Sequence, residues 1–271
     1  MTTLPPDLAQ AIASAAPRLG GFTGLRYLAE ADSTNDLALA LAAEGAPEGT
    51  SVLADAQRAG RGRRGRSWFS PPGAGLYLSV IVRPPGPAET LSLVTLSAGV
   101  AVARALQSTT ALPIELKWPN DVVIGRPWRK LGGLLCESAG VGSAVDAVVI
   151  GIGINLRPAA YPREIAARAT SIETELGRPI DRAPVVVDVL TSLAEVIHRL
   201  WRHDHAWVRS EWRRFARAGL GGASVLWTEH GQDRRGLARD IDDQGALLVD
   251  AEGRTQRLVA GEVTWERLGR E

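Results

Sequence analysis

The 271-residue chain is poor in the residues that mark several large classes of protein. It contains one cysteine, Cys136, so an internal disulfide framework is excluded. No stretch approaches the roughly 18 consecutive apolar residues of a membrane span, and the N-terminal residues show no basic leader followed by an apolar core. These absences argue against a secreted, disulfide-stapled domain and against a membrane protein. They predict a cytoplasmic location and no membrane partner.

The chain has almost no excess of positive over negative charge, and it contains very few lysines. The formal net charge is +1, which excludes a molecule that binds nucleic acid through its whole surface. Lysine and arginine together number 31, yet only Lys117 and Lys130 are lysines. An ammonium is a compact, tunable charge that a guanidinium cannot copy, so these two positions are candidates for function. Composition alone favours two ordinary surface lysines.

The hydrophobic fraction of 45% and the charged fraction of 23% are typical of a folded globular protein. Apolar periodicity and capping residues divide the first 220 residues into strands and helices. We expect strands at 24–30, 50–57, 76–82, 114–118, 131–138 and 144–154, and helices at 35–44, 88–107, 181–201 and 205–218. After the linker at 219–222, short alternating strands at 224–227, 235–241, 246–249 and 255–259 predict a small β module. The prediction is an α+β fold with domains at 1–220 and 221–271.

The most distinctive segment is Gly60–Trp68, which reads GRGRRGRSW. Its four arginines repel one another and its three glycines raise the entropy of ordering, so the isolated loop should be mobile. Guanidinium groups and exposed amides favour phosphate or carboxylate, and such a ligand would order it.

Three interpretations of this loop compete. A solvated basic loop is the plainest, and single-stranded nucleic-acid binding is a second. A dinucleotide site is a third, because Gly60, Gly62 and Gly65 satisfy G-x-G-x-x-G. That motif requires a helix directly afterwards, and the following sequence FSPPG cannot begin one. The dinucleotide interpretation is therefore rejected.

Four further motifs accompany the loop. They are S-T-N at 33–35, K-W-P-N-D at 117–121, K-L-G-G-L-L-C-E at 130–137 and G-I-G-I-N at 151–155. Each has a structural interpretation: Ser33 can cap a helix, the Trp-Pro pair can pack and turn, and the Gly-Gly pair can mark a β-bulge. Gly151 and Gly153 can thin a strand where another element crosses it. The four histidines follow no metal or catalytic spacing, and Cys136 is interpreted as core filler.

Taken together and in this order, the five motifs resemble the catalytic domain of biotin–protein ligases. The motifs of the resemblance lie between about Tyr27 and Leu156, and the general sequence pattern of the family continues through the C-terminal β module. One motif alone would be weak, whereas five in register are specific. The resemblance implies a mixed β-sheet flanked by helices, as in class II synthetases, with a small SH3-like β-barrel at the C-terminus.

The implied activity is ATP-dependent activation of biotin to biotinoyl-5′-AMP, with Mg²⁺ as cofactor and release of pyrophosphate. Biotin then passes to a lysine of the biotin carboxyl carrier protein domain of a biotin-dependent carboxylase. The resemblance leaves open whether the chain is a monomer or a homodimer, and which carboxylase supplies the carrier.

The family's residue roles carry over to the matching positions by resemblance. The implied biotin site comprises Ser33, Thr34, Asn35, Gln57, Gly60, Arg61, Lys130 and Gly133. The implied ATP site comprises Arg63, Arg66, Trp68, Asn120 and Asn155. Lys130, Arg63 and Arg66 are the expected catalytic charges, and Asp121 is the expected Mg²⁺ ligand. Hydroxyl and amide groups suit the neutral ureido ring of biotin, and the cations suit two anionic reactants.

Departures from the family pattern are small. Gly132 stands where the family usually has alanine, and Cys136 where it has an aliphatic residue. Some members carry an N-terminal winged helix-turn-helix and repress biotin genes, whereas only about 25 residues precede the first expected strand here. We therefore expect no repressor role and no nucleic-acid partner. The nearest alternative is a lipoate–protein ligase, and the basic glycine-rich loop favours biotin.

Overall fold

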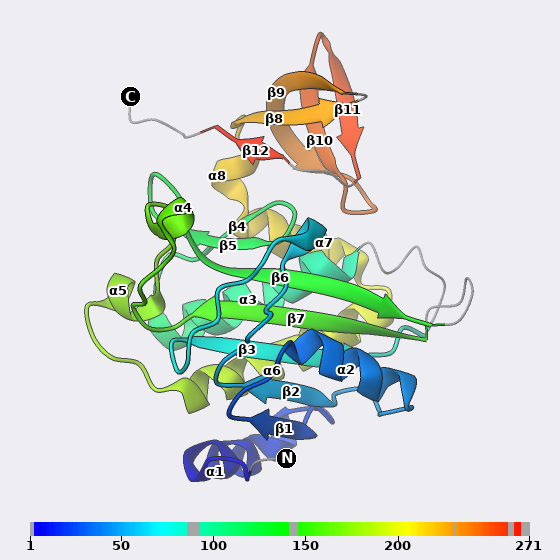
Figure 1. Cartoon of the computed structure of the whole chain (residues 1–271). Coiled ribbons are helices and arrows are strands. Elements are labelled where there is room, and N and C mark those ends of the chain that lie inside the picture. Colours follow the sequence, from blue (N-terminus) through cyan, green and yellow to red (C-terminus); the bar gives the residue numbers. More distant parts are fainter. Residues whose placement is uncertain (1–2, 86–92, 141–145, 230, 260–262, 267–271) are drawn as a thin grey trace.

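The computed structural model describes residues 3–85, 93–140, 146–229, 231–259 and 263–266, which form two sheets (Figure 1). The larger is a seven-stranded sheet in the order β1-β2-β3-β7-β6-β5-β4, and the smaller is a five-stranded sheet in the order β11-β10-β9-β8-β12. In the larger sheet β1 and β2 are parallel and the other neighbours antiparallel. The predicted α+β class, with a mixed sheet and a small C-terminal β module, is confirmed.

The strands of the larger sheet fall close to the predicted segments. They are β1 (Leu25–Leu28), β2 (Ser51–Ala54), β3 (Gly75–Val82), β4 (Glu115–Lys117), β5 (Asp121–Ile124), β6 (Arg129–Ala139) and β7 (Ala147–Asn155). Every residue of β3 is buried, as its unbroken apolar run predicts. β5 was not predicted. Residues 144–145, which the predicted strand 144–154 includes, lie outside the described residues.

The helices are α1 (Pro6–Ala15), α2 (Thr34–Ala43), α3 (Val94–Thr110), α4 (Arg163–Ala166), α5 (Ile172–Leu176), α6 (Arg182–Trp201), α7 (His205–Phe215) and α8 (Arg217–Leu220). The four predicted helices correspond to α2, α3, α6 and α7. Residues 88–92 of the predicted helix 88–107 lie outside the described residues. Among the helices described, none is long and apolar enough to cross a membrane.

The seven-stranded sheet separates two layers of unequal thickness (Figure 1). Helices α3, α6 and α7 cover one face and enclose the main core, which includes the fully buried Val102, Leu106 and Leu190. The single helix α2 covers part of the other face over a smaller cluster that includes Ala38 and Val149. The rest of that second face is left for loops, and the site lies there.

The C-terminal module is built from β8 (Ser224–Glu229), β9 (Gln232–Ile241), β10 (Leu247–Ala251), β11 (Arg254–Leu258) and β12 (Thr264–Trp265). The first four strands were predicted, and β12, with two residues, was not. The indole Nε1 of Trp118 donates to the carbonyl of Gly245 at 3.1 Å, and that of Trp265 donates to the carbonyl of Trp118 at 3.1 Å. The module therefore packs against the K-W-P-N-D turn.

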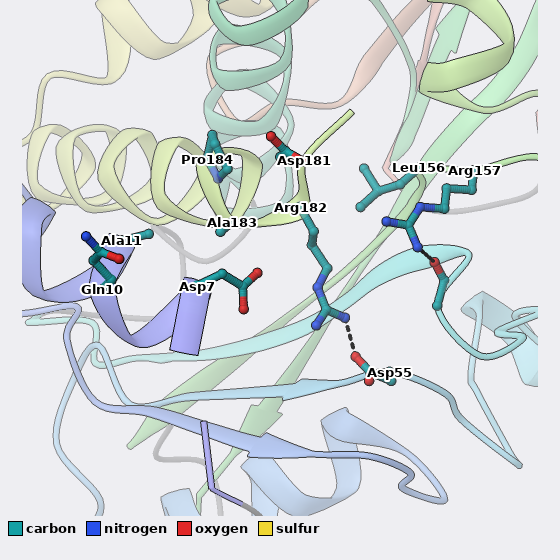
Figure 2. Close-up of a pocket in the computed structure, with 11 residues that line it drawn as sticks. Asp7, Gln10, Ala11, Asp55, Leu156, Arg157, Asp181, Arg182, Ala183 and Pro184 are labelled. Atoms are coloured by element: carbon teal, nitrogen blue, oxygen red, sulfur yellow. Dashed lines mark hydrogen bonds and ion pairs between the residues drawn. The ribbon is translucent and has the colours of Figure 1, made fainter. Parts of the chain in front are cut away.

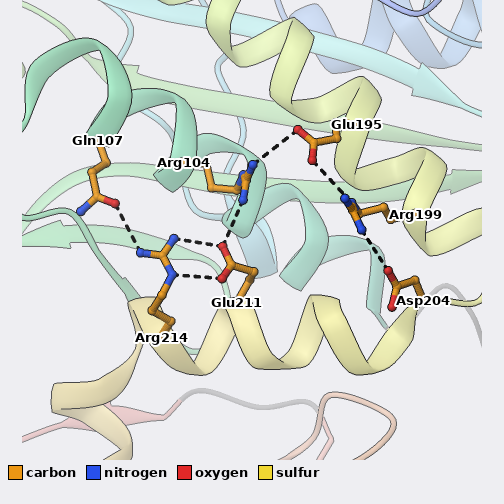
Figure 3. Close-up of polar contacts among 7 residues, drawn as sticks. All are labelled: Arg104, Gln107, Glu195, Arg199, Asp204, Glu211 and Arg214. Carbon is orange, nitrogen blue, oxygen red and sulfur yellow. Dashed lines mark hydrogen bonds and ion pairs between the residues drawn. The ribbon is translucent and has the colours of Figure 1, made fainter.

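Helix α7 joins the helical layer to the C-terminal module. On one side Arg104 and Arg199 stand 5.3 and 4.4 Å from the ring centre of Trp207. Glu211 accepts hydrogen bonds from Arg104 and from both Nε and Nη2 of Arg214 (Figure 3). On the other side Arg209 and Arg213 form ion pairs with the module, at Asp243 and Asp240 respectively.

Glu211 provides a test of this charge network. Hydrogen bonds from Arg214, and then from Arg104, lower the pKa of Glu211 below its ordinary value of 4.5 despite burial. A lowered pKa in the folded state gives stability above pH 4.5 that is lost as the pH falls through the folded-state pKa. In urea unfolding, Glu211→Gln should cost about 1 kcal/mol at pH 7, and the difference should shrink towards pH 3.

The exposed Glu164 provides the matched control, because Glu164→Gln should leave the unfolding curve unchanged at both pH values. A Glu211→Gln difference that stays constant from pH 7 to pH 3 would show that the carboxylate charge contributes nothing.

Candidate active site

A cavity of about 700 Å³ opens on the face of the large sheet that α2 only partly covers. Thirteen of the fourteen residues expected at the site line it, and Gly60 is the exception. The thirteen are Ser33, Thr34, Asn35, Gln57, Arg61, Arg63, Arg66, Trp68, Asn120, Asp121, Lys130, Gly133 and Asn155. Segments more than 120 residues apart thus meet in one cavity. The arginine loop and Lys130 share it.

The first turn of α2 presents the S-T-N motif. Ser33 is the N-cap, and its hydroxyl accepts from the backbone N–H of Asp36 at 3.3 Å. The carbonyl Oε1 of Gln57 accepts from the backbone N–H of Thr34 at 2.9 Å and from its hydroxyl at 3.1 Å. Ser33, Thr34 and Asn35 are all buried. Ser33 is therefore both the helix cap and one of the residues expected to bind a ligand.

The two glycines of G-I-G-I-N make room for side chains from two other motifs. A Cβ at Gly151 would overlap the side chain of Asn35, and a Cβ at Gly153 would lie 2.5 Å from the indole Nε1 of Trp68. Gly153 pairs with Gly133 across β6 and β7, and a Cβ at Gly133 would lie 3.4 Å from the same indole. The glycines thus form a bare patch of sheet on which Asn35 and Trp68 lie. The structural interpretation, in which Gly151 and Gly153 thin a strand where another element crosses it, therefore also holds.

The arginine loop closes on itself between Gly60 and Trp68. The N–H of Gly62 donates to the carbonyl of Arg66 at 2.6 Å, and the N–H of Trp68 donates to the carbonyl of Gly60 at 2.8 Å. A Cβ at Gly60 would lie 2.6 Å from the carbonyl oxygen of Trp68. The lack of a side chain at Gly60 therefore allows the two backbone segments to approach each other closely. At the tip is the short 3-10 turn η2 (Arg63–Gly65).

A β-bulge turns Lys130 towards the cavity. Val122 pairs with Gly132 and Val123 with Lys130, so Leu131 is an extra residue in β6. Strict alternation would place Lys130 and Gly133 on opposite faces of the sheet. With the bulge they share a face, and a Cβ at Gly133 would lie 3.2 Å from Lys130 Nζ. The fully buried Leu131 points instead into the main core.

Both lysines of the chain bind one carboxylate. Lys117 Nζ lies 2.7 Å from Asp121 Oδ2, and Lys130 Nζ lies 2.5 Å from Asp121 Oδ1. Burial by itself would raise the pKa of Asp121, but the attraction of Lys130 and Lys117 outweighs it and the pKa is lowered. Asp121 is therefore ionised at neutral pH, inside a cluster of net charge +1.

This arrangement fits poorly with Asp121 as a protein ligand for Mg²⁺. Both of its oxygens face ammonium groups, which would repel a divalent cation at the same place. Within the described residues, no group of three or more His, Cys, Asp or Glu side chains could hold a metal. A magnesium ion that entered with ATP would belong to the nucleotide, and we derive no step through a protein-bound metal.

The expected asparagines hold backbone in place. Asn120 Nδ2 donates to the carbonyl of Leu134 at 2.6 Å, while its Oδ1 faces Arg63 Nη1 at 3.5 Å. Asn155 Nδ2 donates to the carbonyl of Thr170 at 2.9 Å and thereby fixes the segment after α4 beside Lys130. Cys136 is half-buried and packs against the edge of the main core, in line with its interpretation as core filler, and desolvation raises the pKa of its thiol to about 11.

Sequence reasoning missed part of the cavity wall. Trp265 and Glu266 of the C-terminal module line the cavity, as does Trp128, whose ring meets that of Trp265 edge to face at 5.7 Å. Ser79 and Ser70, which bind lining residues from behind, were also missed. No local pattern marks these residues, because only the packing of distant segments brings them to the site.

A second cavity, of about 620 Å³, lies elsewhere and contains none of the expected site residues. Arg182 points across it to Asp55, and Arg157 donates to the backbone (Figure 2). Asp55 also accepts from the hydroxyl of Tyr27. Arg182 and Asp55 thus satisfy each other, and the cavity lies between α1, the start of α6 and the segments that follow β2 and β7.

Comparison with known proteins agrees with the geometry. Residues 27–155 match the model of the Biotin/lipoate A/B protein ligase family, and residues 225–264 match that of the Biotin protein ligase C terminal domain. The biotin–acetyl-CoA-carboxylase ligase of Mycobacterium tuberculosis is 38% identical over 90% of this chain and 89% of its own length. The bifunctional ligase/repressor BirA of Bacillus subtilis is 35% identical over 85% of this chain and 70% of its own.

A solved structure has the same fold. The biotin protein ligase from Aquifex aeolicus, in complex with biotin and ATP, superimposes with a TM-score of 0.73 at 29% identity, covering 90% of this chain and 99% of that one. The fold and the site thus define a ligase of the biotin/lipoate class. Within that class, this chain belongs to the biotin protein ligase family.

The bare patch can be tested at Gly153. In Gly153→Ala the new methyl group would displace the Trp68 indole, which holds one end of the arginine loop. An overpacking cost of 1–3 kcal/mol would raise the population of the open loop, so trypsin should cleave among its arginines roughly 10-fold faster. Gly24→Ala is the control, because its methyl would meet the nearest atom at an ordinary 3.6 Å.

Equal cleavage of Gly153→Ala and wild type would contradict the assignment. Trp68→Ala provides a second route to the same loosened loop without overpacking the strand, and thermal unfolding separates local opening from general damage.

Proposed function

We propose that this chain activates biotin with MgATP to biotinoyl-5′-AMP, releases pyrophosphate, and transfers the biotinoyl group to a lysine of a biotin carboxyl carrier protein domain. One observation carries this proposal: buried hydroxyl and amide groups share a single cavity with the arginine loop and Lys130. A neutral polar ring and two anionic groups could be held there side by side.

The S-T-N turn and Gln57 provide the neutral end. The ureido ring of biotin has two N–H donors and one carbonyl acceptor, and hydroxyl and amide side chains are its natural partners. Ser33, Thr34 and Gln57 are such groups. Arg61 and the backbone beside Gly60 and Gly133 would complete this end.

The cations provide the anionic end. Biotin's carboxylate attacks the α-phosphorus of ATP, the bond to the β-phosphate oxygen breaks, and pyrophosphate leaves with its electrons. The approach of two anions is the main barrier, so fixed positive charge should supply most of the rate. Lys130, Arg63 and Arg66 would supply it, with Trp68, Asn120 and Asn155 positioning the nucleotide.

Transfer follows in the same cavity. The uncharged amine of the carrier lysine attacks the carbonyl carbon of the mixed anhydride, an amide bond forms, and AMP leaves. The arginine loop and the residues of the C-terminal module would exclude water while the adenylate waits. We place the domain boundary between residues 220 and 221, and the enzyme in the cytoplasm, where ATP and carrier domains are available.

The decisive experiment is incorporation of labelled biotin into a purified carrier domain. Transfer should require both ATP and Mg²⁺ and should vanish when the carrier lysine is replaced by arginine. Labelled lipoate offered to a lipoyl domain tests the neighbouring activity. Transfer of lipoate without transfer of biotin would overturn the proposal.

Lys130 should carry a large share of the first step. Lys130→Ala should lower pyrophosphate exchange dependent on biotin by about 10²-fold or more, the loss seen when one key electrostatic donor is removed. Arg58→Ala is the control, because Arg58 pairs with Glu30 and Asp32 outside the cavity. Exchange within a few-fold of wild type in Lys130→Ala would remove Lys130 from its role.

A further inference from the structure

Ser79 is a buried polar residue that the proposed function does not use. It lies in β3 among apolar neighbours and its exposure is 0%. Burying a hydroxyl without partners is costly, so its hydrogen bonds matter. Ser79 Oγ lies 2.5 Å from Asn35 Oδ1 and 2.8 Å from Thr34 Oγ1. Both partners belong to the S-T-N motif, and both line the cavity, whereas Ser79 stands behind them.

The orientation of the Asn35 amide is fixed from both ends. Its Nδ2 donates to Glu137 Oε2 at 2.8 Å and faces the carbonyl of Leu135 at 3.3 Å. Its Oδ1 must then face Ser79, because an amide oxygen can only accept. With donors and acceptor both engaged inside the protein, and with the side chain seated over Gly151, Asn35 is held as a bridge rather than presented to a ligand.

Proton counting gives the consequence for Thr34. The single Ser79 proton is shared between Asn35 Oδ1 and Thr34 Oγ1, of which Asn35 Oδ1 is the closer. Thr34 donates its own proton to Gln57 Oε1 at 3.1 Å, so that proton points into the protein. Towards the cavity Thr34 offers a lone pair. It is set as an acceptor for a ligand N–H.

The same hydrogen bonds reach both flanks of the arginine loop. Glu137 Oε2 also binds Arg61 Nη2 at 2.7 Å, near the start of the loop. At the other end Gln57 Nε2 donates to Ser70 Oγ at 2.8 Å, and Ser70 Oγ donates to the carbonyl of Trp68 at 3.1 Å. One chain of contacts therefore runs from Arg61 through Glu137, Asn35, Ser79, Thr34, Gln57 and Ser70 to Trp68.

We propose that Ser79 and Glu137 are positioning residues that set Thr34 as an acceptor for the ureido N–H of biotin and fasten the arginine loop to the same hydrogen-bond chain. This inference rests on the proposed function, since it names the ligand group that Thr34 receives. It predicts that damage to the chain raises the KM for biotin more than the KM for ATP, because Thr34 would contact biotin directly whereas the residues proposed for ATP are reached only through the loop.

Ser79→Ala should raise the KM for biotin about 10-fold, because it leaves Asn35 Oδ1 without its donor and removes the contact that holds the Thr34 oxygen in place. The KM for ATP should stay within about two-fold. Ser97→Ala is the matched control. Ser97 is also 0% exposed, and its hydroxyl has no hydrogen-bond partner in the described part of the chain. It should leave both KM values unchanged.

Glu137→Gln is the second variant, and it keeps the test decisive if Ser79→Ala folds poorly, because the Glu137 side chain is 26% exposed. It should raise the KM for biotin by loosening Asn35 and Arg61. The double variant should cost less than the product of the two single effects, since both act on one chain of contacts.

An unchanged KM for biotin in both variants would overturn the inference, as would equal rises for biotin and ATP, which a merely structural role would give. If the two effects multiply in the double variant, Ser79 and Glu137 act independently, which would contradict the single chain of contacts. A wild-type enzyme that fails to transfer biotin at all would instead refute the proposed function, so the two failures are distinguishable.

Discussion

The site depends on a patch of bare backbone in the middle of the seven-stranded sheet. Gly133, Gly151 and Gly153 present no side chain towards the cavity, so Asn35 and Trp68 can lie directly on β6 and β7. Glycine in a strand costs about 0.5–1 kcal/mol relative to alanine. Here that cost is offset by buried contacts between three segments that are far apart in sequence. Polar and aromatic groups thus reach the sheet surface without a wide gap between the layers.

Much of this arrangement could be predicted from the sequence. The strands and long helices follow from apolar periodicity, and Ser33 as a cap follows from local chemistry. The order of the five motifs indicated which segments should meet. Ser79 could not be predicted, because a lone serine in an apolar strand has no signature and its partners come from α2. Trp265 was equally hidden, since only the packing of the C-terminal module brings it to the cavity.

Sequence reasoning was least reliable where a residue's task is set by its neighbours. Asp121 looks like a metal ligand in isolation, but in the fold it lies between the chain's two lysines. Gly60 was expected to face a ligand, and in the fold the lack of a side chain there also allows the close approach of the Trp68 carbonyl. For both residues the type was informative, whereas the neighbours that surround it could not be predicted. Direction depends on register and on bulges, which composition does not encode.

Helix α7 gives the C-terminal module its place in the molecule. Ion pairs from Arg209 and Arg213 hold the module on one side, while Trp207 and Glu211 anchor the helix to α3 and α6 on the other. The wall of the cavity that contains Trp265 is therefore attached to the far layer of the catalytic domain through a helix that never touches the cavity itself.

Because Leu131 is an extra residue in β6, the length of this part of the chain decides on which face of the sheet Lys130 lies. The count of residues between the β5–β6 turn and Gly133 decides which side of the sheet receives the ammonium of Lys130, independently of which amino acids fill the turn. Substitutions in the turn are compatible with the site as long as that count is kept. Inserting or deleting one residue there would turn the ammonium of Lys130 to the opposite face of the sheet, where Leu131 now packs into the apolar main core. In this hairpin the number of residues therefore matters more than their identity.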